Sequence, residues 1–402
     1  MNIKGKAIIA QGGGPTAVIN QSLAGAVLEM KKHKEITGIY GALHGVRGII
    51  EENFLDLTEA SQENLEAVAQ TPCAALLSTR DKPDEEYCEK IFQVFKKYDI
   101  RYFFYIGGND SSDTVRLVNE YAESENYDFK AFHIPKTIDN DLVINDHTPG
   151  YGSAARFVAQ AFMGVNLETK ALDGIYIGIV MGRHAGFLTA AAALGRRNEE
   201  DGPHLIYLPE RPFNIDTFLK DVAAVYDKLG RCVIAVSEGI IDEEDTPIAA
   251  KLKENVRRDS HGNIELAGGE LGDMLSKAVK DNLNISRVRA DTFGYLQRSF
   301  PGSISDTDQK EARLAGMAAV QFAMMEEYQS GSVILDRIGE YEIQYTLTEL
   351  ENIAAKTKHM PDEFINEQGN HVTEAFIKYG EPLIGTDFKK TVSLDAPMVK
   401  KL

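Results

Sequence analysis

Two short turns decide how this chain folds: Gly107-Gly108-Asn109-Asp110-Ser111-Ser112 and Pro135-Lys136-Thr137-Ile138-Asp139-Asn140-Asp141. Each turn follows an apolar stretch, residues 102–106 for the first and 131–134 for the second, and both stretches are predicted to be strands. Both turns therefore lie at the carboxyl ends of strands, where open α/β sheets bind their ligands. The sequence predicts a ligand site to which both turns contribute.

The two turns carry complementary chemistry. The glycine-rich turn offers backbone N–H groups that suit phosphate, and the second turn offers Asp139, Asp141, Lys136 and Thr137. A carboxylate can take the proton of a sugar hydroxyl that attacks phosphorus, so the combination indicates phosphoryl transfer. Asp110 is unusual, because a carboxylate in a phosphate turn repels anions unless it excludes another group or holds a metal ion. The acidic string alone would also suit a polar surface turn.

The same strand-then-turn pattern recurs along the chain. Apolar stretches at residues 6–10, 175–180, 205–208 and 233–236 end in glycine, proline or charged residues, and helical patterns separate many of them. This alternation predicts an α/β fold of two Rossmann-like three-layer domains with mostly parallel sheets and an active site in the cleft between them. If the strand ends point the same way, they bring together Asp110, Asp139, Asp141, Arg183 and Glu238.

A chain of 402 residues is too long for one ordinary core, and two breaks suggest where it passes between domains. The first break is Pro149-Gly150-Tyr151-Gly152, and the second lies near Pro301-Gly302. We predict a phosphoryl-donor domain made of residues 1–149 plus 297–346. The remaining residues, 150–296 plus 347–402, are predicted to form a sugar-phosphate domain.

Gly12-Gly13-Gly14 follows the first predicted strand and precedes a helix for which Thr16 is the expected N-cap. Two interpretations stay open for this triplet, a seat for phosphate made by its N–H groups or a tight strand-to-helix turn. The triplet lacks the spacing of a dinucleotide fingerprint, and the chain has no Walker-type glycine-lysine-threonine or glycine-lysine-serine run.

The net charge of −18 argues against nucleic acid and anionic membranes as main partners. The amino-terminal residues lack the apolar core of a signal peptide, and no apolar run approaches the ~20 residues of a membrane span, so we expect a cytoplasmic protein. An anionic substrate would need a local basic cluster, for which the candidates are Arg80, Arg183, Arg289 and Arg298. Each of these arginines could instead be a solvated surface residue.

Taken in order, these segments resemble the phosphofructokinase family and, within it, the pyrophosphate-dependent branch. The resemblance covers nearly the whole chain and rests on Gly12-Gly13, Arg80, residues 107–111, residues 135–141, Met181-Gly182-Arg183, Glu238, Tyr295 and the step from Arg289 to Arg298. It implies a reversible, Mg²⁺-dependent transfer of phosphate from pyrophosphate to the C1 hydroxyl of fructose 6-phosphate. It also implies a homodimer or homotetramer, because Arg289 would reach the site of a neighbouring subunit.

The resemblance assigns a role to each candidate residue. Asp139 would be the base that deprotonates the C1 hydroxyl, and catalysis would also involve Asp141, Lys136, Thr137, Asp110 and Arg183. The donor would be bound by Gly13, Arg80, Asn109, Asp110 and Lys136. The sugar phosphate would be bound by Thr137, Asp139, Met181, Gly182, Arg183, Glu238, Arg289, Tyr295 and Arg298. The metal would be held by Asn109, Asp110 and Asp141.

The choice of donor is expected to depend on Asp110 and Lys136. ATP-dependent relatives typically carry glycine at both positions, which leaves room for the α-phosphate and sugar of the nucleotide. Here Asp110 would add bulk and negative charge against that part of ATP, and Lys136 would add a cation for the charge that develops on pyrophosphate. Asn109 stands where many members of the family carry a metal-binding aspartate, and Tyr295 stands where bacterial ATP enzymes carry histidine.

Three alternative functions were compared with this one. A pyrophosphate-dependent kinase for sedoheptulose 7-phosphate would present the same phosphate and C1 groups to the same motifs. An ATP-dependent 6-phosphofructokinase would differ only in the donor. A non-catalytic sugar-phosphate sensor on the same fold is disfavoured, because its expected sign is the loss of Asp139 or Asp141, and the chain has both.

Overall fold

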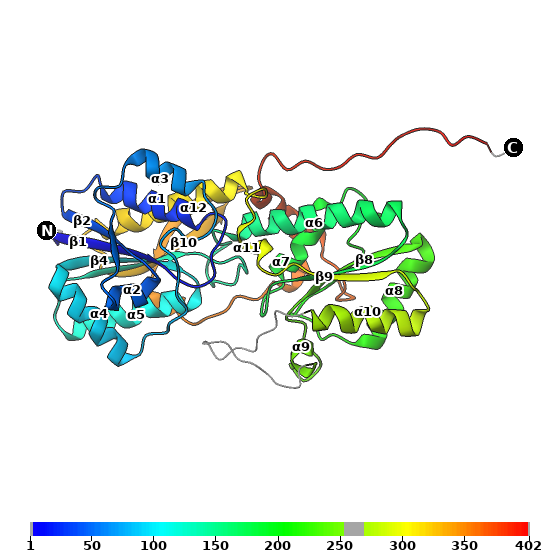
Figure 1. Cartoon of the computed structure of the whole chain (residues 1–402), viewed down its shortest axis with the longest axis horizontal. Coiled ribbons are helices and arrows are strands. Elements are labelled where there is room, and N and C mark those ends of the chain that lie inside the picture. Colours follow the sequence, from blue (N-terminus) through cyan, green and yellow to red (C-terminus); the bar gives the residue numbers. More distant parts are fainter. Residues whose placement is uncertain (1–2, 253–268, 401–402) are drawn as a thin grey trace.

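A computed structural model of the protein describes residues 3–252 and 269–400, and they form two sheets that lie side by side (Figure 1). The first sheet has the order β11-β10-β5-β4-β1-β2-β3. All its neighbours are parallel except β2 with β3 and β10 with β11. Its strands are β1 (Gly5–Gln11), β2 (Ile36–Ala42), β3 (Phe54–Asp56), β4 (Ile100–Gly107), β5 (Lys130–Pro135), β10 (Ser330–Ile338) and β11 (Glu342–Thr348).

Helices cover both faces of this first sheet. One face packs against α1 (Ile19–Met30), α3 (Gln62–Ala69) and α12 (Asp306–Ala323). The other face packs against α2 (Gly45–Ile50), α4 (Glu85–Tyr98) and α5 (Asn109–Ser124). The first sheet is thus the middle of three layers, as Figure 1 shows.

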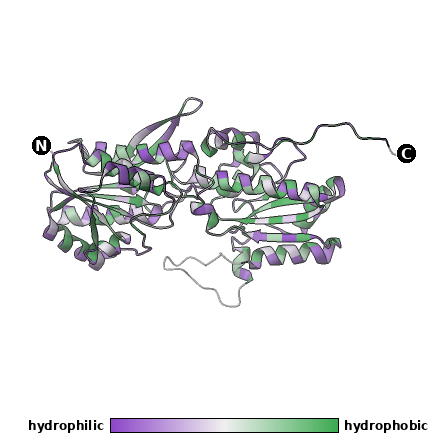
Figure 2. Ribbon diagram, turned by 45° about the horizontal axis from the view of Figure 1, so that its top comes forward, coloured by the Kyte–Doolittle hydropathy of each residue, from purple (hydrophilic) through white to green (hydrophobic). Residues whose placement is uncertain are grey.

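Alternation along β4 explains the two cores. Tyr102, Phe104 and Ile106 point to the core under α1 and α12, whereas Phe103 and Tyr105 point to the core under α4 and α5. A strand that is buried on both faces needs apolar side chains at every position, and this is why the run looks uniformly apolar in the sequence. Figure 2 shows these central strands as largely hydrophobic ribbons between amphipathic helices.

The second sheet has the order β7-β8-β6-β9, and all its neighbours are parallel. Its strands are β6 (Gly174–Val180), β7 (Leu205–Tyr207), β8 (Arg231–Ser237) and β9 (Val288–Thr292). One face packs against α8 (Ile215–Leu229), α9 (Ile248–Lys251) and α10 (Glu270–Leu283). The other face packs against α6 (Tyr151–Ala171), α7 (Phe187–Ala190), α13 (Glu374–Gly380) and the short 3-10 helices Ala191–Gly195, Asp362–Phe364 and Glu381–Ile384.

The chain passes between the two halves after β5, through α11 (Leu296–Ser299), and again after β11 by way of a 3-10 turn, Leu350–Asn352. The first passage is fixed by Asp308 of α12, whose carboxylate accepts the N–H groups of Gly150 and Ser153 at 2.8 Å each. These are donors at the start of α6, so Asp308 caps that helix from the opposite half. The domain boundaries predicted at 149/150, 296/297 and 346/347 stay predictions; β11 extends to Thr348.

The α/β fold with mostly parallel sheets is confirmed. The expected N-cap of α1 is wrong, because the helix begins after Val18 rather than after Thr16. The Thr16 hydroxyl accepts the N–H of Val18 at 3.3 Å, a local turn that delays the start of the helix. In residues 3–252 and 269–400, no helix is both long and apolar enough to cross a membrane.

Candidate active site

The predicted site residues follow the carboxyl ends of strands from both sheets. Gly12 to Gly14 follow β1, Asn109 and Asp110 begin α5 after β4, and residues 136–141 follow β5. In the second sheet, residues 181–183 follow β6 and Glu238 follows β8. The electrostatic coupling of Asp139 with Arg183, Arg298 and Glu238 places the two groups of turns near one another.

The glycine turn after β1 lies beside the side chain of Lys136. The Lys136 ammonium donates to the carbonyl of Gly14 at 2.7 Å, and a Cβ atom on Gly13 would lie 3.3 Å from Lys136 Nζ. Gly13 also has a φ of +73°, which other residues rarely adopt. The backbone conformation therefore favours glycine at this position, and the lysine ammonium lies close to it.

Two of the three N–H groups of this turn are used within the fold. The N–H of Gly12 donates to Ile106 at 2.9 Å, and the N–H of Gly13 donates to Thr79 at 3.0 Å. Both N–H groups are bound by backbone carbonyls, as in a tight strand-to-helix turn, and the phosphate seat stays a prediction that rests on Gly14. What the turn presents to the site is the cation that it surrounds, Lys136.

Lys136 has an unusual electrostatic environment. Its side chain is buried, and burial together with the positive charges of Arg298 and Arg80 lowers its pKa to about 7, against the opposing effect of Asp139 and Asp141. Losing hydration destabilises an ammonium ion unless anions replace the water. An anionic ligand at this point would supply that charge.

Asp139 and Asp141 form a close acidic pair. Burial raises the pKa of Asp139, although Arg298, Arg183 and Lys136 act in the opposite direction. Burial and the neighbouring Asp139 raise the pKa of Asp141 to about 7. A raised carboxyl pKa suits a group that must accept a proton near neutral pH.

The backbone of the turn orients these two carboxylates. The hydroxyl of Thr137 accepts the N–H of Asp139 at 3.1 Å, and Asn140 between the two acids has a φ of +58°. Asparagine tolerates this left-handed conformation better than most residues. The local sequence thus favours a sharp turn with an acid on each side.

Asn109 has the arrangement expected of a residue beside a cation. Its amide nitrogen donates to Asp141 Oδ2 at 3.3 Å, whereas its Oδ1 is buried with no hydrogen-bond partner. An orphaned buried oxygen next to a carboxylate fits Mg²⁺, which binds through one or two protein oxygens together with the phosphates of its substrate. Within residues 3–252 and 269–400, no cluster of three or more His, Cys, Asp or Glu side chains could hold a metal ion.

Asp110 occupies a more open position than its neighbour. Its carboxylate is 2.8 Å from the ammonium of Lys82, and the two side chains are about half exposed, 49% and 48%. It lies in the first turn of α5, where a negative charge stabilises the helix. Asp110 therefore stands at the rim of the site and Asn109 inside it.

The turns of the second sheet present a buried acid and an arginine. Burial and the charge of Asp139 raise the pKa of Glu238 to about 7, while Arg183 opposes that shift. Gly182 has a φ of +129°, and its carbonyl accepts the hydroxyl of Ser237 at 2.6 Å. This bond ties the turn after β6 to the end of β8.

Arg298 lies between the two groups of turns. A Cβ atom on Gly14 would be 3.2 Å from its guanidinium carbon, and its charge acts on both Asp139 and Glu238. The guanidinium also stands 4.7 Å from the ring centroid of Tyr295, whose side chain is 71% exposed. The arginine thus faces the turns of the first sheet and those of the second sheet.

Arg289 is not brought to this site. It lies on β9, the edge strand of the second sheet, where its side chain is exposed and donates to the carbonyl of Val288 at 3.0 Å. Arg80 is exposed as well, but its positive charge lowers the pKa of Lys136 and that of Arg298, so it lies near both side chains.

Three contacts were missed by the sequence analysis. Lys82 pairs with Asp110, the amide oxygen of Gln297 accepts the N–H of Met181 at 3.1 Å, and the N–H of Lys358 donates to the carbonyl of Asp141 at 2.7 Å. Lys82 follows Arg80 by two positions, and this proximity was the one signal available. Gln297 and Lys358 belong to no motif.

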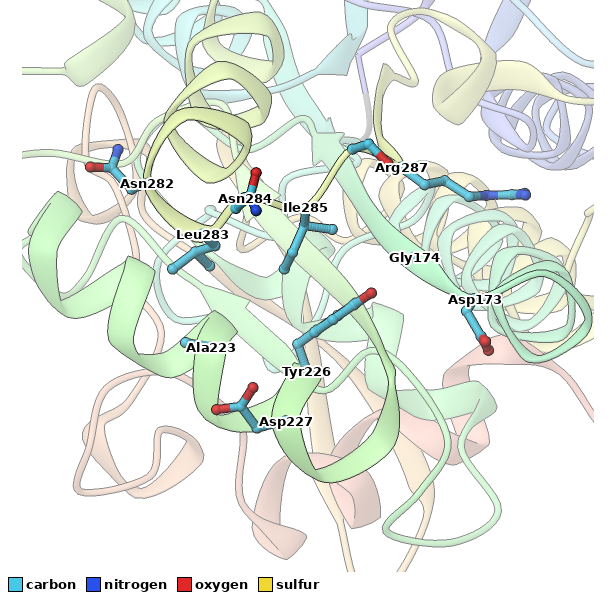
Figure 3. A pocket seen from close by; sticks show the side chains of 11 residues that line it. Asp173, Gly174, Ala223, Tyr226, Asp227, Asn282, Leu283, Asn284, Ile285 and Arg287 are labelled. Atoms are coloured by element: carbon cyan, nitrogen blue, oxygen red, sulfur yellow. The ribbon is translucent and has the colours of Figure 1, made fainter.

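A separate cavity of about 630 Å³ lies at the other end of the second sheet (Figure 3). Tyr226 and Asp227 of α8 line it on one side, and residues 282–287, which run from the end of α10 toward β9, line it on the other. It adjoins Gly174 at the start of β6, whereas Arg183 follows the end of that strand. The cavity is therefore distinct from the candidate active site.

Comparisons with known proteins agree on one family. The family described as Phosphofructokinase matches residues 6–323. A pyrophosphate–fructose 6-phosphate 1-phosphotransferase from Rhodospirillum rubrum is 61% identical over 383 residues, which cover 95% of each chain. One of the same name from Halomonas elongata is 35% identical over 396 residues, covering 95% of this chain and 92% of that one.

A solved structure gives the same result. The pyrophosphate-dependent phosphofructokinase from Marinobacter aquaeolei superposes with a TM-score of 0.84 and 32% sequence identity, covering 99% of this chain and 98% of that one. The fold, the ordered motifs and these similarities lead to one conclusion: this chain belongs to the phosphofructokinase family.

Proposed function

We propose that this protein transfers a phosphoryl group reversibly from pyrophosphate to the C1 hydroxyl of fructose 6-phosphate. The products are fructose 1,6-bisphosphate and phosphate. The observation that carries the proposal is a buried lysine, Lys136, beside the acidic pair Asp139 and Asp141. The names of the similar proteins from Rhodospirillum and Halomonas support the same donor and acceptor.

In the proposed reaction Asp139 accepts the proton of the C1 hydroxyl. The C1 oxygen then bonds to one phosphorus of pyrophosphate while the bridging P–O bond breaks, and inorganic phosphate leaves with that bond pair. Lys136 and Arg298 neutralise the charge on the transferring group and on the leaving phosphate. In the reverse direction the protonated Asp139 returns its proton to the C1 oxygen.

Mg²⁺ would be held by Asp141 and Asn109, whose unpaired Oδ1 faces no other partner, together with oxygens of pyrophosphate. Bound there, the ion would supply positive charge against the phosphoryl oxygens. Asp110 lies at the rim with Lys82 and is proposed chiefly to exclude the larger, more anionic nucleotide.

The sugar phosphate is proposed to lie against the second sheet, on Met181, Gly182, Arg183, Glu238, Tyr295 and Arg298. Thr137 and Asp139 would contact the reacting end of the sugar, and Gly13 and Arg80 would face pyrophosphate. Arg289 would contact the sugar phosphate bound to a second copy of the chain, so the enzyme is proposed to be a cytoplasmic homodimer or homotetramer. The predicted division into donor and sugar domains is part of this proposal.

A grid of donors against acceptors tests the function. The purified protein is assayed with pyrophosphate or ATP as donor, with fructose 6-phosphate or sedoheptulose 7-phosphate as acceptor, and with Mg²⁺ titrated in each case. We expect turnover with pyrophosphate and fructose 6-phosphate, and little with ATP. Turnover with ATP alone would contradict the proposed donor, and a clear preference for sedoheptulose 7-phosphate would support the alternative sugar kinase.

The variant Asp139→Ala tests the proposed base. This variant removes both the proposed general base and its negative charge. We expect kcat to fall by about 10²–10⁴-fold while the fold is retained. Circular dichroism and thermal melting provide the check on folding. If Asp139→Ala keeps most of the wild-type kcat, another group must take the proton.

A further inference from the structure

The turn between the two catalytic acids is held by a residue from the far end of the chain. Asn140 is fully buried, and its left-handed φ of +58° sets the directions in which Asp139 and Asp141 leave the backbone. Asparagine tolerates such a conformation, and the contacts of a buried side chain hold it in one orientation. The surroundings of Asn140 are therefore part of the geometry of the acidic pair.

The fixing contact is a tyrosine hydroxyl. The amide nitrogen of Asn140 donates to the hydroxyl of Tyr379 at 2.7 Å, and that hydroxyl donates to the backbone carbonyl of Asp146 at 2.8 Å. One oxygen atom thus joins the start and the end of residues 140–146. Because Asn140 is fully buried, loss of the hydroxyl would leave its amide N–H group without this partner.

Tyr379 is itself held firmly in place. Its ring, on α13, packs against Phe187, Phe364 and Phe376 with centroid distances of 6.1, 5.1 and 6.2 Å. The guanidinium of Arg337 lies 4.8 Å from the ring centroid and donates to the Tyr379 carbonyl at 3.1 Å. The hydroxyl therefore has a fixed position set by the core of the second half.

Lys358 from the same carboxyl-terminal segment supports the next residues of the turn. Its backbone N–H donates to the carbonyl of Asp141 at 2.7 Å. Its ammonium donates to the carbonyls of Asn145 and Asp146 at 2.9 Å each. The acidic turn of one half is thus built onto residues of the other half.

We propose that Tyr379 is a positioning residue for phosphoryl transfer, acting through Asn140 on Asp139 and Asp141. The inference rests on the proposed function, because it assumes that these acids carry the reaction. A base must lie within hydrogen-bond reach of the proton it takes, and a displacement of ~1 Å can cost about 10²-fold in rate. Tyr379 is not among the residues proposed to contact the phosphate of the sugar or pyrophosphate, so its loss should affect kcat more than the KM values.

Tyr379→Phe tests the proposal, because it removes the hydroxyl and keeps the ring. We expect kcat to fall at least about tenfold, with the KM values for fructose 6-phosphate and pyrophosphate within about twofold of wild type. Tyr207→Phe is the matched control. Tyr207 also packs against two phenylalanines, Phe213 and Phe218, and its hydroxyl donates to Asp221 of α8 at 2.9 Å rather than to the acidic turn.

A second variant completes a double-mutant cycle. Asn140→Gly permits the same left-handed backbone but removes the amide, so it should lower kcat like Tyr379→Phe, and the double variant should be little worse than either single one. If Tyr379→Phe does not fold, Asn140→Gly alone must show the loss of kcat at unchanged KM.

Three outcomes would overturn the inference: wild-type kcat in Tyr379→Phe or in Asn140→Gly, additive losses in the double variant, or an equal loss in Tyr207→Phe. Each is measured relative to active wild-type enzyme. A wild-type protein without turnover on pyrophosphate and fructose 6-phosphate would instead contradict the proposed function.

Discussion

At the scale of single residues, the site is a balance of buried charges. Lys136 and Asp141 both have a pKa of about 7, the first lowered and the second raised chiefly by burial. Burial removes water from both groups and so disfavours their charged forms. When one group is partly neutral, its charge stabilises the charged form of the other less. Proton occupancy in this site is therefore set close to neutral pH before any substrate binds.

This balance predicts how activity depends on pH. The acidic pair must be ionised to accept a proton, so kcat/KM should rise with pH as the carboxyl groups deprotonate. Lys136 must be protonated to neutralise phosphate, so kcat/KM should fall again as pH passes about 7. We expect a narrow bell-shaped profile of kcat/KM for pyrophosphate, with its maximum near neutral pH.

Lys136→Arg identifies the group behind the alkaline limb, because a guanidinium stays charged throughout this range. The alkaline limb should move upward by at least about one pH unit in this variant. Lys82→Arg, a change at the exposed rim, should keep the wild-type limb. An unchanged alkaline limb in Lys136→Arg would assign it to another group.

Residue types and their order were enough to predict that Lys136, Asp139 and Asp141 lie close together. Lys136, Asp139 and Asp141 stand together in the sequence, so their proximity needed no long-range information. The use of the Gly12 and Gly13 amides was different, because their acceptors, Ile106 and Thr79, are reached only when distant segments pair. The acceptors of these N–H groups can therefore be identified only from the three-dimensional structure.

At the scale of elements, the first two residues of α5 contact different parts of the site. Asn109 points inward to Asp141, and Asp110 points outward to Lys82. The two neighbours differ because successive residues of a helix face directions about 100° apart. In the proposed function, the helix start would therefore divide metal binding and donor exclusion between adjacent positions.

The donor specificity can be tested at this helix start. Asp110→Gly removes the carboxylate, so the ratio of kcat/KM for ATP to that for pyrophosphate should rise by about tenfold or more, which corresponds to ~1.4 kcal/mol. Asp113→Gly, one helical turn later and paired with Arg116, is the control and should leave the ratio unchanged. If Asp110→Gly lowers the activity with both donors equally, Asp110 serves catalysis rather than discrimination.

Strongly patterned elements were predicted well, and the connections between them were not. The strands at residues 6–10, 175–180 and 233–236 all lie within β1, β6 and β8. The carboxyl-terminal segment that supports the acidic turn has no motif, and the partners Asn140 and Tyr379 are 239 residues apart. Periodicity describes which face of an element is buried, but not which distant element covers it.

At the scale of the whole molecule, Arg289 is the residue that a single chain leaves out of the site. Its position on the exposed edge strand β9 suits a contact with a second copy of the chain. A guanidinium binds phosphate through paired hydrogen bonds, so its loss should raise the KM for the sugar phosphate. Arg289→Ala should therefore be impaired even though the chain folds normally.

Subunit mixing distinguishes a contribution across the interface from one within the chain. Arg289→Ala and Asp139→Ala are each assayed alone and then after dissociation and reassociation together. In a hybrid dimer one site would carry both substitutions and the other neither, so a random mixture should recover about a quarter of wild-type activity. No recovery, with light scattering showing that hybrids form, would place Arg289 in its own subunit's site or outside the reaction.

The sheet order has a consequence for biosynthesis. β5 leaves the ribosome early, but its parallel partner β10 pairs through Ser330, Gly331 and Ser332, which are made nearly 200 residues later. At about 5–20 residues per second the edge of β5 waits on the order of tens of seconds for its neighbour. During that interval the nascent first half presents an open strand edge to other chains. The first sheet can be completed only after the strands of the second sheet have been synthesised. The half that begins the chain therefore cannot be the first half to finish folding.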